Sequence, residues 1–217
     1  PKTAWPPTCK STVFKLLMGL YQPKAGTITI GGVDIQQIDR KYLRAHVGLI
    51  LQEPFLYSKS IRENVGTTAP EQEAERIEHA ADIASASGFI AKADKGWETV
   101  VGERGVGLSG GQKQRLSLAR ALADNPSILI MDDTTSAVDM ETEAEIQKHL
   151  KEMDGGKTIV AIAHRISSVK DSDLILVLEH GRIVERGTHA ELVAAHGRYW
   201  DIYHKQLGLQ SGVAQGF

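Results

Sequence analysis

The sequence contains one cysteine, no long hydrophobic run and no excess of basic residues. Cys9 alone cannot form an internal disulfide bond, which fits a reducing compartment. No apolar run approaches the roughly 18 residues that a membrane-spanning helix needs, and no signal peptide is recognisable. The formal net charge of −2 argues against a nucleic-acid partner, because binding along a phosphate backbone needs a basic face.

The composition is that of an ordinary soluble α/β protein, with 41% hydrophobic and 24% charged residues. At 217 residues the chain can bury a substantial core, and we expect one domain. Apolar patterns predict strands over 27–30, 46–51, 128–131, 158–163, 174–178 and 183–185. They predict helices over 70–87, 112–123, 141–153 and 191–206. Strands that alternate with helices indicate a layered α/β sheet.

Polar residues follow two of the predicted strands. The continuous apolar run 128–131, typical of a strand covered on both faces, leads directly into Asp132 and Asp133. His164 follows the strand predicted at 158–163. Because ligands of such sheets bind at the carboxyl ends of the strands, these three side chains are candidates for a ligand site.

The most specific short stretch is Ser109-Gly110-Gly111-Gln112, at the start of a predicted helix. Helix starts expose unpaired N–H groups, two glycines let an anion approach the backbone, and the serine hydroxyl adds a donor. The alternative is a glycine-rich turn with a serine cap. That alternative is favoured for Ser-Gly-Gly alone, but it becomes unattractive once the basic stretch 113–116 and the acid-ended strand follow.

At this point a resemblance can be stated. The stretch LSGGQKQRLSLARALADNPSILIMDDTTSAVD resembles the signature and Walker B region of ATP-binding-cassette (ABC) ATPases, the motors of ABC transporters. LILQEPFLYSKSIRENV is similar to the family's Q-loop region, VVGERGVGLSGGQ to its approach to the signature, TIVAIAHRISSV to its switch histidine, and ILVLEHGRIVERGTHAELV to its closing strands. The similarity covers nearly the whole chain, and the ERG and SIRENV segments resemble the exporter branch.

The resemblance implies a P-loop NTPase (RecA-like) fold, with a mostly parallel sheet flanked by helices. It implies an ABC ATPase domain over residues 1–204, a helical subdomain at about 67–116 inserted before the signature, and a loose tail over 205–217. It also implies a transmembrane domain fused upstream, and hence a place at the cytoplasmic face of the cell membrane. The transported substrate would be selected by that membrane domain.

The resemblance also assigns roles to residues that bind ATP and Mg²⁺ within one subunit. Lys10 would hold the β- and γ-phosphates, with Thr12 beside it, while Ser11 and Asp132 would hold magnesium, Asp132 through water. Gln52 would contact magnesium and the attacking water, and its loop would touch the transmembrane domain. The alternative for Gln52 is a strand cap.

Other residues would act between subunits or on the terminal phosphate. Ser109, Gly110, Gly111 and Gln112 would cover the ATP bound by a second ABC ATPase subunit, and Asp139 would cross that dimer interface. His164 would contact the γ-phosphate. The alternatives are a helix cap for Asp139 and a partly buried structural histidine for His164.

The sequence departs from the family pattern after the Walker B aspartate, where Asp133 replaces the usual glutamate. Its carboxylate is set back by one methylene, and a misplacement of about 1 Å can cost on the order of a hundredfold in rate. We therefore expect the chain's own site to be slow. This pattern resembles one half of heterodimeric exporters, so the expected partner is an unlike subunit, with a second copy of this chain as the alternative.

A second departure lies before Lys10, where family glycines would align with Ala4, Pro7 and Cys9. Proline has no N–H and a fixed φ, so Pro7 would weaken a phosphate cradle. An alternative alignment makes KTA the start of an incoming strand and loses residues before Lys10. A truncated or misread beginning is the simplest explanation, and a degenerate loop is the other.

Three function classes follow from these observations. The leading one is an exporter ATPase that closes on ATP and opens after hydrolysis. A non-transport ABC ATPase would show a second cassette or a long coiled-coil insertion, and neither is present in this sequence. The third class is an inactive fragment with a broken phosphate loop.

Overall fold

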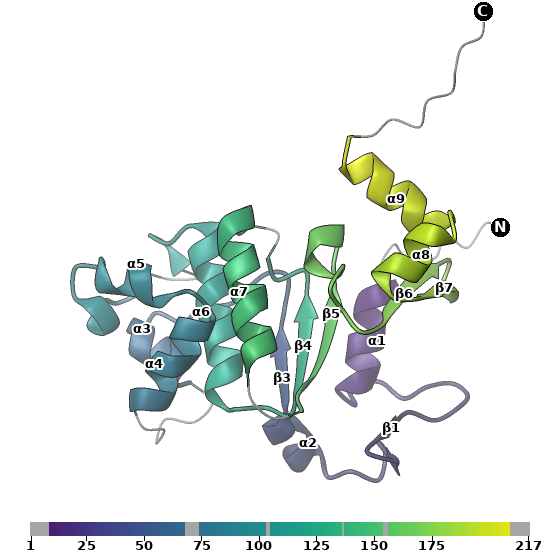
Figure 1. The fold of residues 1–217 in the computed structure, drawn as a ribbon. Helices are drawn as coiled ribbons and strands as arrows, with labels where there is room; N and C mark the ends of the chain where they lie inside the picture. The colour runs from purple at the N-terminus through teal and green to yellow at the C-terminus, as the bar shows by residue number, and fades with distance from the viewer. Residues whose placement is uncertain (1–8, 68–73, 103–104, 136, 154–155, 209–217) are drawn as a thin grey trace, which may run out of the picture. The chain divides into compact units, whose positions relative to one another are not determined.

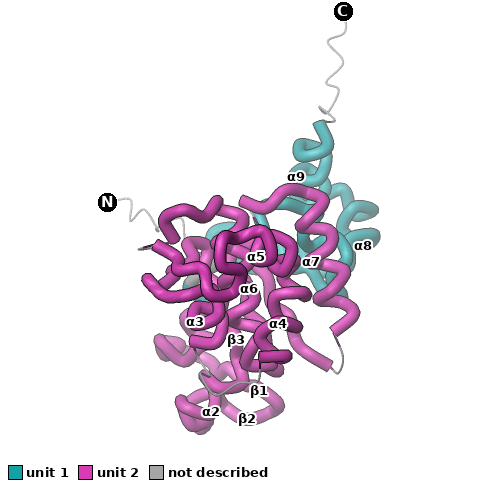
Figure 2. Tube along the Cα trace, turned by 90° about the vertical axis from the view of Figure 1, so that its left-hand side faces the viewer, with its two compact units in different colours: residues 1–13, 163–217 teal, residues 14–162 magenta. Residues whose placement is uncertain are grey.

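A computed structural model describes residues 9–67, 74–102, 105–135, 137–153 and 156–208, with side chains from Thr12 onward. The chain divides into two compact units, which Figure 2 distinguishes by colour. Unit 1 comprises Pro1–Val13 and Ala163–Phe217, and unit 2 comprises Phe14–Ile162. Across the described ranges, every helix is too short or too polar to pass through a bilayer.

The centre of unit 2 is a three-stranded parallel sheet with the order β3-β4-β5 (Figure 1). Its strands are β3 (Val47–Ile50), β4 (Ile128–Asp132) and β5 (Thr158–Ile162). Ile50 is in register with Met131, and Asp132 with Ile162, so the three strands end at the same edge. The predicted α/β fold with a parallel sheet is confirmed.

Helices connect these strands. Between β3 and β4 the chain forms α3 (Ile61–Val65), α4 (Ala74–Ile83), α5 (Ser87–Ala91), a short 3-10 turn (Gly96–Glu98) and α6 (Gly110–Ala123). Between β4 and β5 it forms α7 (Met140–Glu152). Helix α6 ends where Asn125 takes a left-handed backbone (φ 51°) ahead of Pro126, a common way to stop a helix. The start and end of α6 therefore both follow from local sequence.

Unit 2 has a core on each face of its sheet. Leu129 and Met131 belong to the larger core, together with Leu116 of α6 and Ile146 of α7. Ile130 joins the smaller one, which contains Phe14 of α1 (Cys9–Leu17), Leu43 of α2 (Arg40–His46) and neighbours of the hairpin β1 (Thr29–Ile30) and β2 (Val33–Asp34). Successive strand residues face opposite sides, so the continuous apolar run in β4 serves both cores.

Unit 1 is built on the antiparallel hairpin β6 (Ile175–Glu179) and β7 (Arg182–Gly187). A 3-10 turn, η3 (Ile166–Ser168), and two helices, α8 (His189–Ala194) and α9 (Arg198–Gln206), pack on it. Ile166, Ile175, Leu192 and Tyr199 form its buried core.

Two predicted helices are wrong in extent. The helix expected over 191–206 is split into α8 and α9, because His196 takes a left-handed backbone (φ 49°) and Gly197 becomes the N-cap of α9. The helix expected over 70–87 is interrupted between α4 and α5, where Ser85 has φ 51°. Within the tail expected at 205–217, Lys205 and Gln206 complete α9, while 209–217 lie outside the described residues.

Candidate functional site

The acidic pair lies at the carboxyl edge of the unit 2 sheet. Asp132 is the last residue of β4, and both Asp132 and Asp133 are half-buried. Asp133 has a left-handed backbone (φ 48°), a conformation that aspartate tolerates better than most residues. Its N–H donates to the Ile162 carbonyl over 3.0 Å, which fixes the pair against the end of β5. Two carboxylates are therefore held at this edge by backbone geometry.

Gln52 lies at the same edge, two residues beyond the end of β3, with an exposed side chain. Because β3 and β4 are parallel neighbours in register, Gln52 and the acidic pair follow adjacent strand ends. Carboxylate and amide oxygens are ligands that Mg²⁺ accepts. Among the described residues no group of three or more His, Cys, Asp or Glu side chains could hold a metal. Mg²⁺ usually keeps several waters and binds substrate phosphates, so a few oxygen ligands at this edge are enough to fit it.

The segment after Asp133 is firmly packed. Thr134 and Thr135 are buried, and the Thr135 hydroxyl donates to Oε1 of Glu143 over 2.7 Å. Glu143 is only 3% exposed, and this hydrogen bond offsets part of the cost of burying its side chain. Thr134 and Thr135 are therefore packed against α7.

Asp139 ends this segment as the N-cap of α7. Its carboxylate accepts the Thr142 N–H and the Thr142 hydroxyl, each over 2.9 Å. These hydrogen bonds hold the pKa of Asp139 below its ordinary value. The helix-cap interpretation is confirmed. A role across a dimer interface stays a prediction, and the exposed position of Asp139 leaves its carboxylate accessible.

The glycine-rich turn forms the start of α6, as predicted. Ser109 and Gln112 make a reciprocal capping box: Ser109 Oγ accepts the Gln112 N–H over 3.2 Å, and Gln112 Oε1 accepts the Ser109 N–H over 2.9 Å. Ser109 and Gly110 are exposed. A hydroxyl that accepts one bond can still donate another, so Ser109 retains a donor for an anion at the helix start.

A close contact with the backbone of Ala137 requires glycine at position 111, in addition to any need for an anion to approach the helix start. A Cβ built on Gly111 would lie 2.9 Å from the Ala137 carbonyl oxygen, and one on Gly110 would lie 3.2 Å from the Ala137 Cβ. Gln114 adds a hydrogen bond, because its Oε1 accepts the Ala137 N–H over 3.0 Å. The first turns of α6 are thus fixed to the loop between the acidic pair and Asp139.

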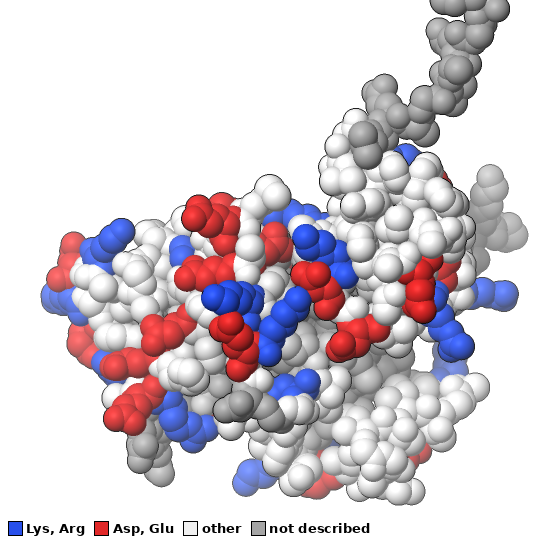
Figure 3. Space-filling view, viewed as in Figure 1, with Lys and Arg blue, Asp and Glu red and all other residues white. Residues whose placement is uncertain are grey.

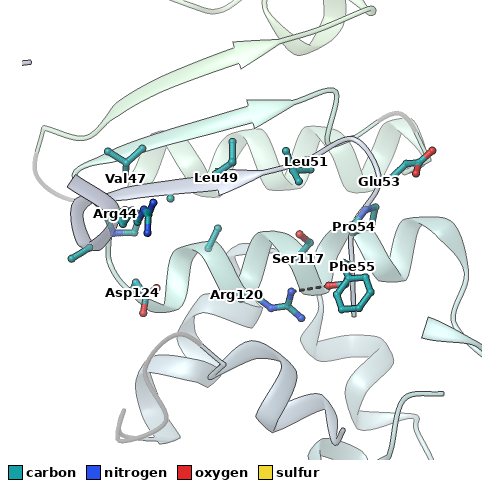
Figure 4. Close-up of a pocket in the computed structure, with 14 residues that line it drawn as sticks. Arg44, Val47, Leu49, Leu51, Glu53, Pro54, Phe55, Ser117, Arg120 and Asp124 are labelled. Carbon is teal, nitrogen blue, oxygen red and sulfur yellow. Dashed lines mark hydrogen bonds between the residues drawn. The ribbon is translucent and has the colours of Figure 1, made fainter. Parts of the chain in front are cut away.

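Helix α6 also holds the segment that follows Gln52. Arg120 donates to the Phe55 carbonyl over 2.7 Å, to the Asn64 carbonyl over 2.6 Å and to Asn64 Oδ1 over 2.9 Å. Burial lowers the pKa of Arg120. Figure 4 shows Arg120 reaching from α6 toward Phe55, at one side of a pocket of about 200 Å³. The pocket lies between β3, residues 51–55 and α6.

Unit 1 holds the other predicted site residues. Lys10, Ser11 and Thr12 lie in the first turn of α1, which is where a helix start can receive a phosphate. The side chains of Lys10 and Ser11, and all of residues 1–8 with Ala4 and Pro7, lie outside the described residues. The structure therefore shows a helix at this position that the apolar patterns did not predict, and the cradle before it stays a prediction.

His164 is exposed, so its interpretation as a partly buried histidine is wrong. Its carbonyl accepts a hydrogen bond from Nε2 of Gln206 over 2.7 Å. Sequence reasoning missed Gln206, because nothing in the spacing of residues 164 and 206 indicates that they meet.

The predicted site residues thus fall into two sets. Gln52, Ser109–Gln112, Asp132, Asp133 and Asp139 belong to unit 2, and Lys10, Ser11, Thr12 and His164 belong to unit 1. Within unit 2, the structure places Gln52, Asp132 and Asp133 at adjacent strand ends. It also joins the glycine-rich turn at Ser109–Gln112, called the signature turn below, to the loop before Asp139.

Comparisons with known proteins identify a family and several relatives of this chain. The family model described as ABC transporter matches residues 7–136. ATP-binding cassette sub-family B member 10, mitochondrial, of Mus musculus is 44% identical over 212 residues, which are 96% of this chain and 30% of that protein. The uncharacterized ABC transporter ATP-binding protein YknU of Bacillus subtilis (strain 168) is 50% identical over 197 residues, 91% of this chain and 34% of that protein.

Among solved structures, a bacterial Atm1-family ABC exporter with ATP bound is similar to this chain with a TM-score of 0.88 and 39% identity. The match covers 91% of this chain and 35% of the exporter chain. The chain spans about a third of the length of the relatives it matches.

Proposed function

The chain belongs to the ABC transporter family as one of its ATPase domains, and on that basis we propose that it is the ATP-hydrolysing motor of an exporter. The exposed backbone at the start of α6 fits the phosphates of a nucleotide. The carboxylate and amide oxygens at the edge of the sheet fit the magnesium that accompanies it. Bound MgATP would supply a phosphoryl group for attack by water.

The observation that carries the proposal is the set of contacts between the start of α6 and the loop that follows the acidic pair. Gly111 and Gln114 fix the signature turn to the Ala137 backbone, which leads from the acidic pair to Asp139. A turn that only capped a helix would need the capping box of Ser109 and Gln112 but not the close approach at Gly111. The exposed face of the turn is then available to a nucleotide held by a second subunit.

Residue roles follow from position. Lys10 would hold the terminal phosphates from the first turn of α1, with Ser11 and Thr12 beside it. Magnesium would be held by Ser11, Asp132 and Gln52. Gln52 would also contact the attacking water, which Asp133 would position, and His164 would contact the γ-phosphate. Ser109, Gly110, Gly111, Gln112 and Asp139 would act across the interface with a second ABC ATPase subunit.

The segment after Gln52 is suited to contact a transmembrane domain. Phe55 and Tyr57 are 54% and 43% exposed, and their rings pack edge to face at 5.1 Å. Arg120 donates to the Phe55 carbonyl, which ties the backbone of this segment to α6. An amphipathic helix from a membrane domain could bury these rings, which would place the assembly at the cytoplasmic face of a membrane.

The partner is proposed to be an unlike subunit, because Asp133 makes the chain's own site slow. In the partnered complex, Asp133→Glu should raise MgATP turnover, since the longer side chain moves the carboxylate forward by about 1 Å. Unchanged turnover in a complex that binds ATP would contradict this part of the proposal.

No nucleic-acid partner is proposed. On the face that Figure 3 shows, Lys and Arg side chains are interspersed with Asp and Glu over unit 2. A stripe of basic side chains, which binding to a phosphate backbone requires, is not visible on that face. The non-transport relatives in the ABC superfamily therefore remain the weaker alternative.

The test is retention of a fluorescent ATP analogue by the purified chain in the presence of Mg²⁺. We expect binding that Lys10→Ala abolishes and that Lys15→Ala, later in the same helix, preserves. Failure of the unsubstituted chain to retain nucleotide would favour the alternative of an inactive fragment with a broken phosphate loop.

A further inference from the structure

The last residue of α9, Gln206, binds the backbone on both sides of Arg165. Its Nε2 donates to the His164 carbonyl over 2.7 Å, and its Oε1 accepts the Ile166 N–H over 2.8 Å. Arg165 is extended (φ −103°, ψ 132°), so the flanking carbonyl and N–H point to the same side. A primary amide offers a donor and an acceptor side by side, and Gln206 pairs with this segment as a neighbouring strand would.

Both ends of this contact are anchored within unit 1. Ile166 is buried with Ile175, Leu192 and Tyr199, which fixes the chain after His164. At the other end of α9, Oε2 of Glu185 accepts the Tyr199 N–H over 2.9 Å, and the Tyr199 hydroxyl lies 2.8 Å from Nδ1 of His189. The helix that carries Gln206 is therefore held in place by β7 and α8.

The contact acts on the backbone of His164 and leaves its ring exposed. We propose that Gln206 is a positioning residue for His164, which sets the direction of the imidazole by fixing the backbone from 164 to 166. This inference rests on the proposed function, in which that imidazole contacts the γ-phosphate. Gln206 itself would touch no reacting atom.

The position of Gln206 argues against a purely structural role. Its side chain is exposed at a helix end, and the core of unit 1 is formed by other residues. Both hydrogen bonds of its amide go to backbone groups beside Arg165, the His164 carbonyl and the Ile166 N–H. Loss of the amide should therefore leave the fold intact and relax the loop, and a misplacement of about 1 Å at a reacting group can cost on the order of a hundredfold.

The test is steady-state MgATP hydrolysis by the protein in its native assembly, with Gln206→Ala, His164→Ala and the double variant. We expect Gln206→Ala to lower kcat by about tenfold while KM for ATP changes by less than about twofold, because positioning acts in the transition state. In the His164→Ala background, Gln206→Ala should have no further effect, since it acts only through that ring. Lys205→Ala, an exposed neighbour on α9, is the matched control and should retain the kcat of the unsubstituted protein.

If Gln206→Ala unfolds, the same measurement is made on Gln206→Met, which keeps the length of the side chain without its hydrogen bonds. Unchanged kcat in the single variants, or an equal loss in the presence and absence of His164, would overturn the role of Gln206. Hydrolysis absent from the unsubstituted assembly would instead defeat the proposed function, and the role of Gln206 with it. Hydrogen exchange at the Ile166 amide, faster in Gln206→Ala, separates a lost contact from a lost activity.

Discussion

The side-chain oxygen of Gln114 accepts the backbone N–H of Ala137 over 3.0 Å, and so joins helix α6 to the loop that follows the acidic pair. Gln114 lies one turn beyond the exposed signature turn and is only 5% exposed. Movement of the loop between Asp133 and Asp139 would therefore be passed to the start of α6. In the proposed dimer, this links the chain's own Walker site to the surface that covers the partner's nucleotide.

Gln114→Met should remove this link while it retains the volume of the side chain. An N–H left without its acceptor typically costs about 1–3 kcal/mol. We expect a loss of that size in the free energy of unfolding, measured by urea denaturation. Lys113→Met, at the neighbouring position, is the control, and an equal loss in both variants would show that the Ala137 contact is not the cause.

Gly111→Ala should be more damaging than Gly110→Ala. The new Cβ at position 111 would lie 2.9 Å from a backbone oxygen that cannot rotate away, whereas at 110 it would lie 3.2 Å from a methyl group. Overpacking of this kind costs about 1–3 kcal/mol, which exceeds the gain of about 1 kcal/mol from the helix propensity of alanine. Thermal unfolding of the two variants measures the difference. A less stable Gly110→Ala protein would contradict the packing described for α6.

Arg120→Lys should destabilise unit 2 and loosen the segment after Gln52. A lysine cannot reproduce the three hydrogen bonds to Phe55 and Asn64, and it leaves the buried Asn64 short of donors. We expect a loss of about 2–3 kcal/mol in the free energy of unfolding. Arg44→Lys, an exposed arginine that lines the same pocket, is the matched control and should be nearly silent.

The acid limb of stability should depend on Asp139. Its pKa is lower in the folded chain because Thr142 donates to the carboxylate, so its contribution is present above the unfolded pKa of about 3.9. That contribution is lost as the pH falls through the lowered folded pKa. Asp139→Asn keeps a helix-capping oxygen but cannot titrate. Unfolding measured between about pH 2 and 6 should show a shallower acid dependence for Asp139→Asn, and parallel curves would contradict this.

Local chemistry explains which features the sequence could predict. The apolar run of β4 with its acidic end and the helix start at the glycine-rich turn are local patterns, and the structure confirms both. The serine cap of α6, which was the less favoured alternative, is also present, and the part of Gln112 in it was not predicted. The resemblance to ABC ATPases places both patterns in one fold.

Features that depend on tertiary contacts were not predicted. The break between α8 and α9 depends on the left-handed backbone of His196, and a histidine in the sequence does not by itself predict that conformation. The short helices α2 and α3 are too brief to show a helical period. Gln206 meets His164 across 42 positions of sequence, so only the packing of α9 on η3 reveals the pair.

Sedimentation of the purified chain with its proposed partner subunit, in the presence and absence of MgATP, tests the central claim most directly. The account predicts that MgATP raises the mass to that of a two-subunit complex, and that Ser109→Arg, which blocks the signature turn, prevents the rise while Lys10-dependent nucleotide binding persists. A mass that stays monomeric with nucleotide bound, or a complex that forms equally well with Ser109→Arg, would contradict it.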